Sequence, residues 1–209
     1  MESKLFTPVT FGPLTLRNRT IRSAAFESMC PGNAPSDMLL DYHRSVAAGI
    51  GMTTVAYAAV TQSGLSFDRQ LWMRPEIIPG LRRLTDAIHA EGAAAGIQLG
   101  HCGNMSHKSI CGCMPVGASS GFNLYSPTFV RGLRADELPE MARAYGRSVN
   151  LAREAGFDSV EIHAGHGYLI SQFLSPSTNH RKDEFGGSLQ NRMRFMDMVM
   201  EEVMKAAGS

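Results

Sequence analysis

Short apolar runs alternate along the chain with longer segments in which apolar residues recur every three or four positions. Short runs are typical of buried strands, and the longer spacing is typical of helices that bury one face. The sequence therefore predicts strands over residues 20–25, 52–59, 93–99 and 159–162, and helices over residues 36–48, 79–92, 138–156 and 189–208. A hairpin is predicted at the N-terminus, over residues 6–18, with Gly12 and Pro13 at its turn.

The alternation of strand and helix, repeated four times, predicts an α/β fold with parallel strands joined by right-handed crossovers. Two architectures fit this order: an open doubly wound sheet, and part of a (β/α)8 barrel. A dinucleotide-binding open sheet is expected to carry a G-x-G-x-x-G loop after its first strand, and this sequence lacks one there. In both architectures the functional residues lie at the carboxyl ends of the strands.

Residues 100–133, after the third strand, are rich in Gly, Ser, Cys and Pro and show no period. We expect a long structureless loop here, and loops of this length are usually lids or binding loops. The loop holds five residues of types that bind metals: His101, Cys102, His107, Cys111 and Cys113. Their spacing contains no C-x2-C pair, so free thiols are expected and no metal site is predicted.

Composition places the chain among soluble globular proteins. Its 209 residues are enough for one domain, predicted over 1–209, and 44% of them are hydrophobic. The formal net charge is +1 and no basic block occurs, so nucleic acid is not an expected partner. No apolar run approaches the ~20 residues that span a bilayer, and the N-terminus lacks the apolar core of a secretory signal. A cytoplasmic location with reduced cysteines is therefore predicted.

Small residues and one amide mark the ends of the first three predicted strands. Residues 23–25 are Ser-Ala-Ala, and Ala58 lies near the end of the second strand. Small side chains let a flat ligand approach the backbone, although tight barrel packing explains them equally well. Gln98, at the end of the third strand, offers a donor and an acceptor together, which suits an amide-like ring edge. Alone, such a glutamine is more often a structural hydrogen-bonding residue.

The end of the fourth strand carries three titratable side chains within six positions: His163, His166 and Tyr168. Two imidazoles can donate hydrogen bonds to one oxygen and stabilise negative charge that develops there. A phenol beside them can act as a proton donor. A metal site is less well supported, because no carboxylate or cysteine lies nearby at ligand spacing. The cluster favours a catalytic site over isolated polar contacts.

Two long segments of the chain are highly specific: HAGHGYLISQFLSP at residues 163–176 and NHRKDEFGGSLQNR at residues 179–192. Together they resemble the signature of the old yellow enzyme family, the NADH:flavin oxidoreductases and ene-reductases. Supporting segments are LFTP, LTLRNR, RSA and QLGHCG, at residues 5–8, 14–19, 22–24 and 98–103. The resemblance covers nearly the whole chain and is strongest toward the branch that includes 2,4-dienoyl-CoA reductases.

This resemblance implies a TIM-type (β/α)8 barrel with a short N-terminal hairpin, in which FMN lies across the strand ends. Five residues would contact the flavin: Ser23, Ala24 and Ala25 at its dimethylbenzene and N5 side, Ala58 at its ring, and Gln98 at its pyrimidine edge.

The resemblance also implies an ene-reductase reaction. NADH or NADPH would reduce the flavin, and flavin N5 would pass a hydride to the β-carbon of an α,β-unsaturated carbonyl or enoyl thioester. His163 and His166 would hold the carbonyl oxygen of this small-molecule substrate, and Tyr168 would protonate its α-carbon.

A complete barrel of this kind has eight βα units and about 250 residues, whereas four units are predicted here. We therefore expect the chain to form the first four βα units plus the hairpin, the N-terminal half of such an enzyme. The alternative is a non-catalytic half-barrel that keeps the site residues but cannot hold FMN. In either case an unpaired sheet edge predicts self-association.

Overall fold

The computed structural model describes residues 3–208 and divides into two compact units. The first unit comprises the described part of Met1–Ala58 together with Arg69–Gln98 and Leu151–Glu161. The second comprises Ala59–Asp68, Leu99–Asn150 and the described part of Ile162–Ser209. The chain therefore passes between the units several times, and three strands begin in the first unit and end in the second.

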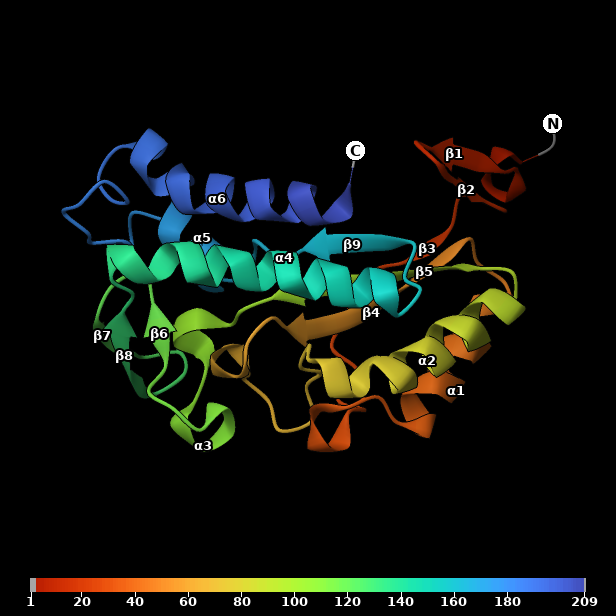
Figure 1. The fold of residues 1–209 in the computed structure, drawn as a ribbon, viewed down its shortest axis with the longest axis horizontal. Coiled ribbons are helices and arrows are strands. Elements are labelled where there is room, and N and C mark those ends of the chain that lie inside the picture. Colours follow the sequence, from red (N-terminus) through yellow and green to blue (C-terminus); the bar gives the residue numbers. More distant parts are fainter. Residues whose placement is uncertain (1–2, 209) are drawn as a thin grey trace. The chain divides into compact units, whose positions relative to one another are not determined.

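A hairpin and a four-stranded sheet are drawn in Figure 1. The hairpin pairs β1 (Val9–Phe11) with β2 (Leu14–Leu16) in antiparallel register, as predicted. The sheet has the strand order β3 (Ile21–Arg22), β4 (Met52–Ala59), β5 (Ala94–Gly100) and β9 (Ser159–Ile162), and β3 is parallel to β4. Spatial order follows chain order without the reversal of a doubly wound sheet, which confirms the predicted α/β fold of barrel type.

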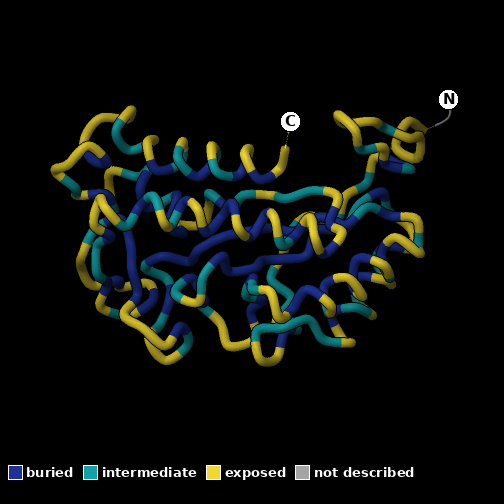
Figure 2. The backbone as a smooth tube through the Cα atoms, viewed as in Figure 1, coloured by how far each residue is buried: buried dark blue, intermediate teal, exposed yellow. Residues whose placement is uncertain are grey.

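Burial explains the continuous apolar runs in the sequences of β4 and β5. Every residue of β4 after Met52 is buried, as is every residue of β5 after Ala94, and Figure 2 draws both strands in dark blue. Strands covered on both faces have no polar side, so their sequences do not alternate. Gly96 permits close strand packing, since a Cβ there would lie 3.0 Å from the Ser159 Oγ atom and 3.1 Å from the Thr54 Oγ1 atom.

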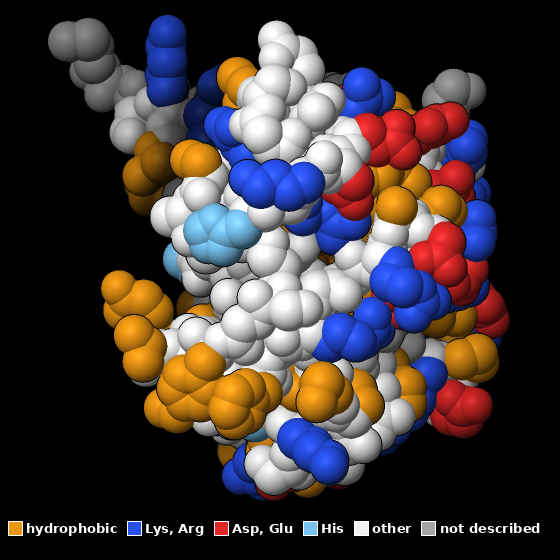
Figure 3. Space-filling model, turned by 90° about the vertical axis from the view of Figure 1, so that its left-hand side faces the viewer, with side chains coloured by type: hydrophobic (Ala, Val, Ile, Leu, Met, Phe, Trp, Pro, Cys, Tyr) orange, Lys and Arg blue, Asp and Glu red, His pale blue; other side chains and the backbone are white. Residues whose placement is uncertain are grey.

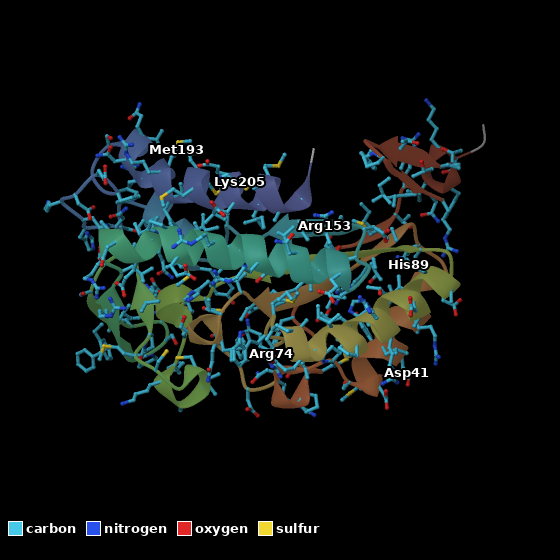
Figure 4. All side chains as sticks on the ribbon, in the orientation of Figure 1. Asp41, Arg74, His89, Arg153, Met193 and Lys205 are labelled. Atoms are coloured by element: carbon cyan, nitrogen blue, oxygen red, sulfur yellow. The ribbon has the colours of Figure 1, made fainter. Side chains whose placement is uncertain are left out.

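Helices α1 (Asp37–Ala47) and α2 (Ile78–Ala90) pack against each other in the first unit. The hydroxyl of Ser36 caps α1 by accepting a hydrogen bond from the Leu39 N–H at 3.2 Å. Near the end of α2, His89 (Figure 4) lies 2.8 Å from the Asp158 carboxylate, which also accepts the Ala95 N–H at 2.7 Å. One carboxylate thus connects α2 to the start of β5.

The second unit contains the region predicted as a structureless loop, and that prediction is wrong. Residues 100–133 form a short helix and three strands, α3 (Lys108–Cys111), β6 (Val116–Gly117), β7 (Gly121–Asn123) and β8 (Thr128–Gly132). The strands pair in the order β6-β8-β7, with β6 parallel and β7 antiparallel to β8. Each strand is too short to show a two-residue alternation in the sequence.

Three further helices complete the described fold. They are α4 (Leu138–Glu154), which begins in the second unit and ends in the first, and α5 (Leu169–Leu174) and α6 (Leu189–Ala207) in the second. The sequence predicted α4 and α6 but missed α5, whose six residues are too few for a helical period. Single 3-10 turns lie at Lys4–Phe6, Pro31–Asn33, Gln62–Gly64, Pro75–Ile77, Gly103–Met105 and Ala135–Glu137.

The second half of the family-like signature holds α5 and α6 together. The rings of Phe173 and Phe195 lie 4.6 Å apart between the two helices. The Asn179 amide donates to the carbonyls of Phe173 and Phe185 at 2.8 and 2.7 Å, and Arg192 Nε donates to the Leu174 carbonyl at 2.7 Å. These signature residues are structural. Within residues 3–208, no helix is long and apolar enough to cross a membrane.

Candidate active site

A tight turn after β9 brings the three predicted catalytic residues together. His166 and Gly167 both have a positive φ, of 54° and 70°, and the Tyr168 N–H donates to the Gly165 carbonyl at 3.0 Å. A positive φ is uncommon for a residue with a Cβ, so the chain holds His166 in a strained backbone conformation. The ring centroid of His163 lies 4.9 Å from that of His166 and 4.8 Å from that of Tyr168.

Hydrogen bonds fix the orientation of the two imidazoles. The Gly165 N–H donates to His163 Nδ1 at 3.3 Å. The other nitrogen of that ring, His163 Nε2, lies 3.2 Å from His166 Nδ1, so the two rings are hydrogen-bonded to each other.

Burial separates the three side chains by access to solvent. His163 is 6% exposed and Tyr168 is 9% exposed, whereas His166 is exposed. The backbone on both sides of the turn is fixed, because the His163 N–H donates to the Leu99 carbonyl at 2.8 Å and the Leu169 N–H donates to the His101 carbonyl at 2.9 Å. A solute therefore reaches the cluster from the side of His166.

Gln172 holds this turn in place through hydrogen bonds, a role that the sequence analysis did not assign. Its amide is buried and donates to the Gly167 carbonyl at 2.6 Å and to Asn104 Oδ1 at 2.9 Å. Its carbonyl oxygen accepts the Asn104 N–H at 3.2 Å. Gly103 allows this packing, since a Cβ there would collide with the Gln172 amide. The only sequence signal was the place of Gln172 inside the signature segment.

A cavity of about 620 Å³ opens beside His166. Drug-sized ligands occupy cavities of this volume, and a few polar groups in an apolar lining usually orient them. The polar lining includes His166, His180 and Asn104, and most of the apolar lining comes from Met105, Val130 and the β7–β8 hairpin. The cavity suits a ligand with one hydrogen-bonding end and an apolar body.

The β7–β8 hairpin presents hydrophobic side chains to this cavity. Phe122, Leu124 and Tyr125 line it and are 50%, 81% and 93% exposed, and hydrophobic side chains gather on the face shown in Figure 3. Asn123 anchors the hairpin, because its amide donates to the Asn104 carbonyl at 2.7 Å while its oxygen accepts the Tyr125 N–H at 3.0 Å. The region predicted as a loop therefore contributes an ordered hairpin to the lining of the cavity.

The first unit carries the residues that the sequence assigned to the cofactor. Ser23 and Ala25 are exposed and Ala24 is half-buried, in an extended segment directly after β3. Ala58, in contrast, is fully buried within β4. Gln98 is 8% exposed, and its amide donates to the Glu161 carboxylate at 2.5 Å.

A buried ion network supports the segment after β3, and the sequence analysis missed it. The Glu27 side chain is 3% exposed and accepts from Arg22 at 2.7 Å, from His43 Nε2 at 3.1 Å and from the Ala56 N–H at 3.2 Å. Arg22 also donates to the Ala25 carbonyl at 3.2 Å. This network holds the small residues after β3 in place. No sequence pattern signalled it, because its members are far apart in the chain.

One histidine of the 100–133 region lies in a buried hydrogen-bond network. Across residues 3–208, no three or more His, Cys, Asp or Glu side chains gather as a metal site requires. His101 is fully buried, where its Nδ1 accepts the Gly103 N–H at 2.9 Å and its Nε2 bonds the Ser63 hydroxyl at 3.0 Å. Burial lowers the pKa of His101 to about 3, so the ring is neutral.

Comparison with known proteins decides the family. The model of the NADH:flavin oxidoreductase / NADH oxidase family matches residues 4–209. The chain belongs to this family. Membership confirms the resemblance to old yellow enzymes, and with it FMN and NADH or NADPH as the cofactors of the family.

Individual reductases and an old yellow enzyme homologue match along nearly the whole chain. The 4,4'-dithiodibutanoate disulfide reductase of Rhodococcus erythropolis is 42% identical over 98% of this chain and 51% of its own length. The old yellow enzyme homologue from Zymomonas mobilis is 30% identical with a TM-score of 0.92, over 99% of this chain and 61% of that chain. A 2-naphthoyl-CoA reductase in complex with 2-naphthoyl-CoA is 28% identical with a TM-score of 0.92, over 98% of this chain and 34% of that chain. The chain thus spans about half the length of the Rhodococcus relative.

The residues of the first unit fit the FMN of this family. The exposed Ser23–Ala25 segment has small side chains, which leave its backbone open to a flat ring. Gln98 supplies a donor and an acceptor at the end of a buried strand, as the polar edge of a flavin requires. The Glu161 carboxylate that now accepts from Gln98 lies on an exposed residue, so the amide can exchange this partner for a ligand.

Proposed function

We propose that the chain is the substrate-binding and proton-donating part of an FMN-dependent NAD(P)H oxidoreductase that reduces carbon–carbon double bonds. The substrate class is an α,β-unsaturated carbonyl compound or an enoyl thioester. The observation that carries the proposal is the His163–His166–Tyr168 cluster beside a cavity with an apolar lining.

His163 and His166 bind the carbonyl oxygen of the substrate. The two rings are hydrogen-bonded to each other, with His163 Nε2 3.2 Å from His166 Nδ1. An oxygen that enters this pair accepts from both rings once the bond between them opens. Both donors then stabilise the negative charge that develops on the oxygen as the double bond is reduced.

Tyr168 donates a proton to the α-carbon. Its ring packs 4.8 Å from the His163 ring and is 9% exposed, so bulk water has little access to the proton it delivers. A positioned general acid of this kind contributes roughly 10²–10⁴-fold to the rate.

The flavin would be held by the first unit. Ser23, Ala24 and Ala25 would contact its ring through their small side chains and backbone, Ala58 would support it from β4, and Gln98 would bind its polar edge. When bound, FMN would supply the hydride, and NADH or NADPH would reduce the flavin again.

The cavity defines what the substrate carries besides its carbonyl group. The hydrophobic side chains of the β7–β8 hairpin would contact an apolar body, and His166 would contact the oxygen. The similarity to a reductase that binds 2-naphthoyl-CoA supports an extended acyl or ring substrate. The Rhodococcus relative reduces a disulfide, so an organic disulfide is a second candidate electron acceptor for the same site.

Single-turnover kinetics of the flavin-loaded protein test the proposal. We expect Tyr168→Phe to slow reoxidation of the reduced protein by 2-cyclohexenone roughly 10²-fold or more, while reduction by NADH keeps its rate. The matched control is Tyr145→Phe, because the Tyr145 hydroxyl is buried without a hydrogen-bond partner and lies outside the cluster. Equal reoxidation rates in the Tyr168→Phe variant and the unmodified protein would exclude Tyr168 as the acid.

A further inference from the structure

Two cysteines of the β5–β6 connection face each other as a dithiol. Cys111 ends α3, and Gly112 follows it with a left-handed φ of 73°, which folds the chain back sharply. The turn places the sulfur of Cys113 3.7 Å from the sulfur of Cys111, and the Cys111 thiol donates to the Cys113 carbonyl at 3.2 Å. A disulfide has an S–S length of about 2.05 Å, so closure requires the sulfurs to approach by less than about 2 Å.

Access to the two thiols is unequal. Cys111 is 1% exposed, whereas Cys113 is exposed and lines a second cavity of about 670 Å³ together with Thr61, Ser63 and Arg131. A small molecule that enters this cavity meets Cys113 first. The inner thiol is then within reach of any adduct formed on the outer one.

We propose that Cys113 and Cys111 form a redox-active dithiol that reduces small-molecule disulfides by thiol–disulfide exchange. This activity is separate from the flavin site and does not depend on the proposed function. The outer residue is the entering nucleophile, and the inner residue resolves the mixed disulfide.

The exchange proceeds in two balanced steps. Deprotonated Cys113 attacks one sulfur of the disulfide R–S–S–R, the S–S bond breaks, and the leaving thiolate takes up a proton. Deprotonated Cys111 then attacks the Cys113 sulfur of the mixed disulfide and releases the second thiol. The protein dithiol loses two electrons and two protons, and one disulfide becomes two thiols. An external dithiol such as dithiothreitol reverses the change.

The surroundings of Cys113 set the pH dependence of the first step. Burial, followed by the hydrogen bond to Cys111, raises the pKa of Cys113 to about 11. The thiolate is the reactive form, so the exchange rate should rise about tenfold per pH unit between pH 7 and pH 10. In the first unit, burial and the nearby Glu27 charge raise the pKa of the Cys30 thiol to about 12.

The test uses 5,5'-dithiobis(2-nitrobenzoate) on the folded, reduced chain, with release of the coloured thiol and intact mass as readouts. At pH 9, where more of Cys113 is thiolate than at pH 7, we expect release of two equivalents and a product that has lost two hydrogen atoms and carries no adduct. Cys111→Ala should release one equivalent and keep a stable adduct on residue 113. Cys113→Ser should abolish this release, and the control Cys30→Ser should match the unmodified chain.

A stable adduct on Cys113 of the unmodified chain would overturn the proposal, because Cys111 would then fail to resolve it. Loss of two hydrogens that persists in Cys113→Ser would also overturn it, by assigning the disulfide to another pair. Circular dichroism of each variant confirms that the comparison is made between folded proteins.

Discussion

His101 is fully buried and neutral, with its Nε2 bonded to the Ser63 hydroxyl and its Nδ1 accepting the Gly103 N–H. The folded-state pKa of about 3 lies below the ordinary value of 6.5. Between these values the unfolded chain binds a proton that the folded chain does not, so stability falls as pH drops below about 6.5.

Urea unfolding between pH 8 and pH 5 measures this linkage. We expect His101 to contribute a loss of up to about 1.4 kcal/mol per pH unit below pH 6. The variant His101→Gln cannot titrate, so its free energy of unfolding should fall less steeply with decreasing pH. Parallel pH profiles for the two proteins would contradict the assignment of a buried neutral imidazole.

Gly103 is the second residue on which the site depends. Its φ of 62° is left-handed, and an added Cβ would collide with the Gln172 amide that holds the turn after β9. We expect Gly103→Ala to lower the free energy of unfolding by about 2 kcal/mol or more. Gly121→Ala is the control, because a Cβ there meets no atom within 4 Å. Thermal unfolding measures the stability of both variants. Equal melting temperatures would refute the expected collision at residue 103.

At the scale of elements, one arginine joins the three-stranded sheet to the segment before α6. Arg181 donates to the carbonyls of Ala118 and Leu133 and pairs with the Asp183 carboxylate at 2.5 Å, while its guanidinium lies 5.5 Å from the Phe173 ring centroid. Lysine has a single charged nitrogen and cannot make this set of hydrogen bonds.

We therefore expect Arg181→Lys to lower the free energy of unfolding by roughly 2 kcal/mol. The control is Arg194→Lys, since Arg194 makes an exposed hydrogen bond of 3.3 Å to Asn191. Urea denaturation measures both changes. An Arg181→Lys variant as stable as the control would show that the hydrogen bonds of Arg181 contribute little to the free energy of unfolding.

The elements also show what the sequence could predict. The sequence predicted β4 and β9 with their observed bounds and α1, α2, α4 and α6 within a few residues, because short apolar runs and helical stripes mark them clearly. It could not predict β6, β7 and β8, which have only two to five residues each. Strands of this kind are specified by pairing partners rather than by their own pattern.

The same distinction applies to the candidate site. His163, His166 and Tyr168 were predictable because they are close in sequence and follow directly on a predicted strand. Gln172 and Glu27 were not, because their roles come from contacts with Asn104, Arg22 and other residues that only the folded chain brings together. Local signals therefore allowed these three residues to be proposed, whereas the supporting contacts required the structure.

At the scale of the whole molecule, the four-stranded sheet has β3 and β9 at its edges, judged over the described residues. Edge strands with free backbone groups are ready to pair with another chain. We expect sedimentation velocity to show association that increases with protein concentration. A single monomeric species across the accessible concentration range would contradict this expectation.

Retention of FMN distinguishes a flavin-binding chain from a half-barrel that cannot hold the cofactor. The chain is mixed with FMN and desalted, and its visible spectrum is recorded before and after addition of NADH and then of 2-cyclohexenone. We expect a retained flavin band that bleaches with NADH and returns with the enone, and a weaker retained band for Gln98→Ala. A colourless protein after desalting would refute the proposed function and support the alternative, a half-barrel that keeps the site residues without holding the cofactor.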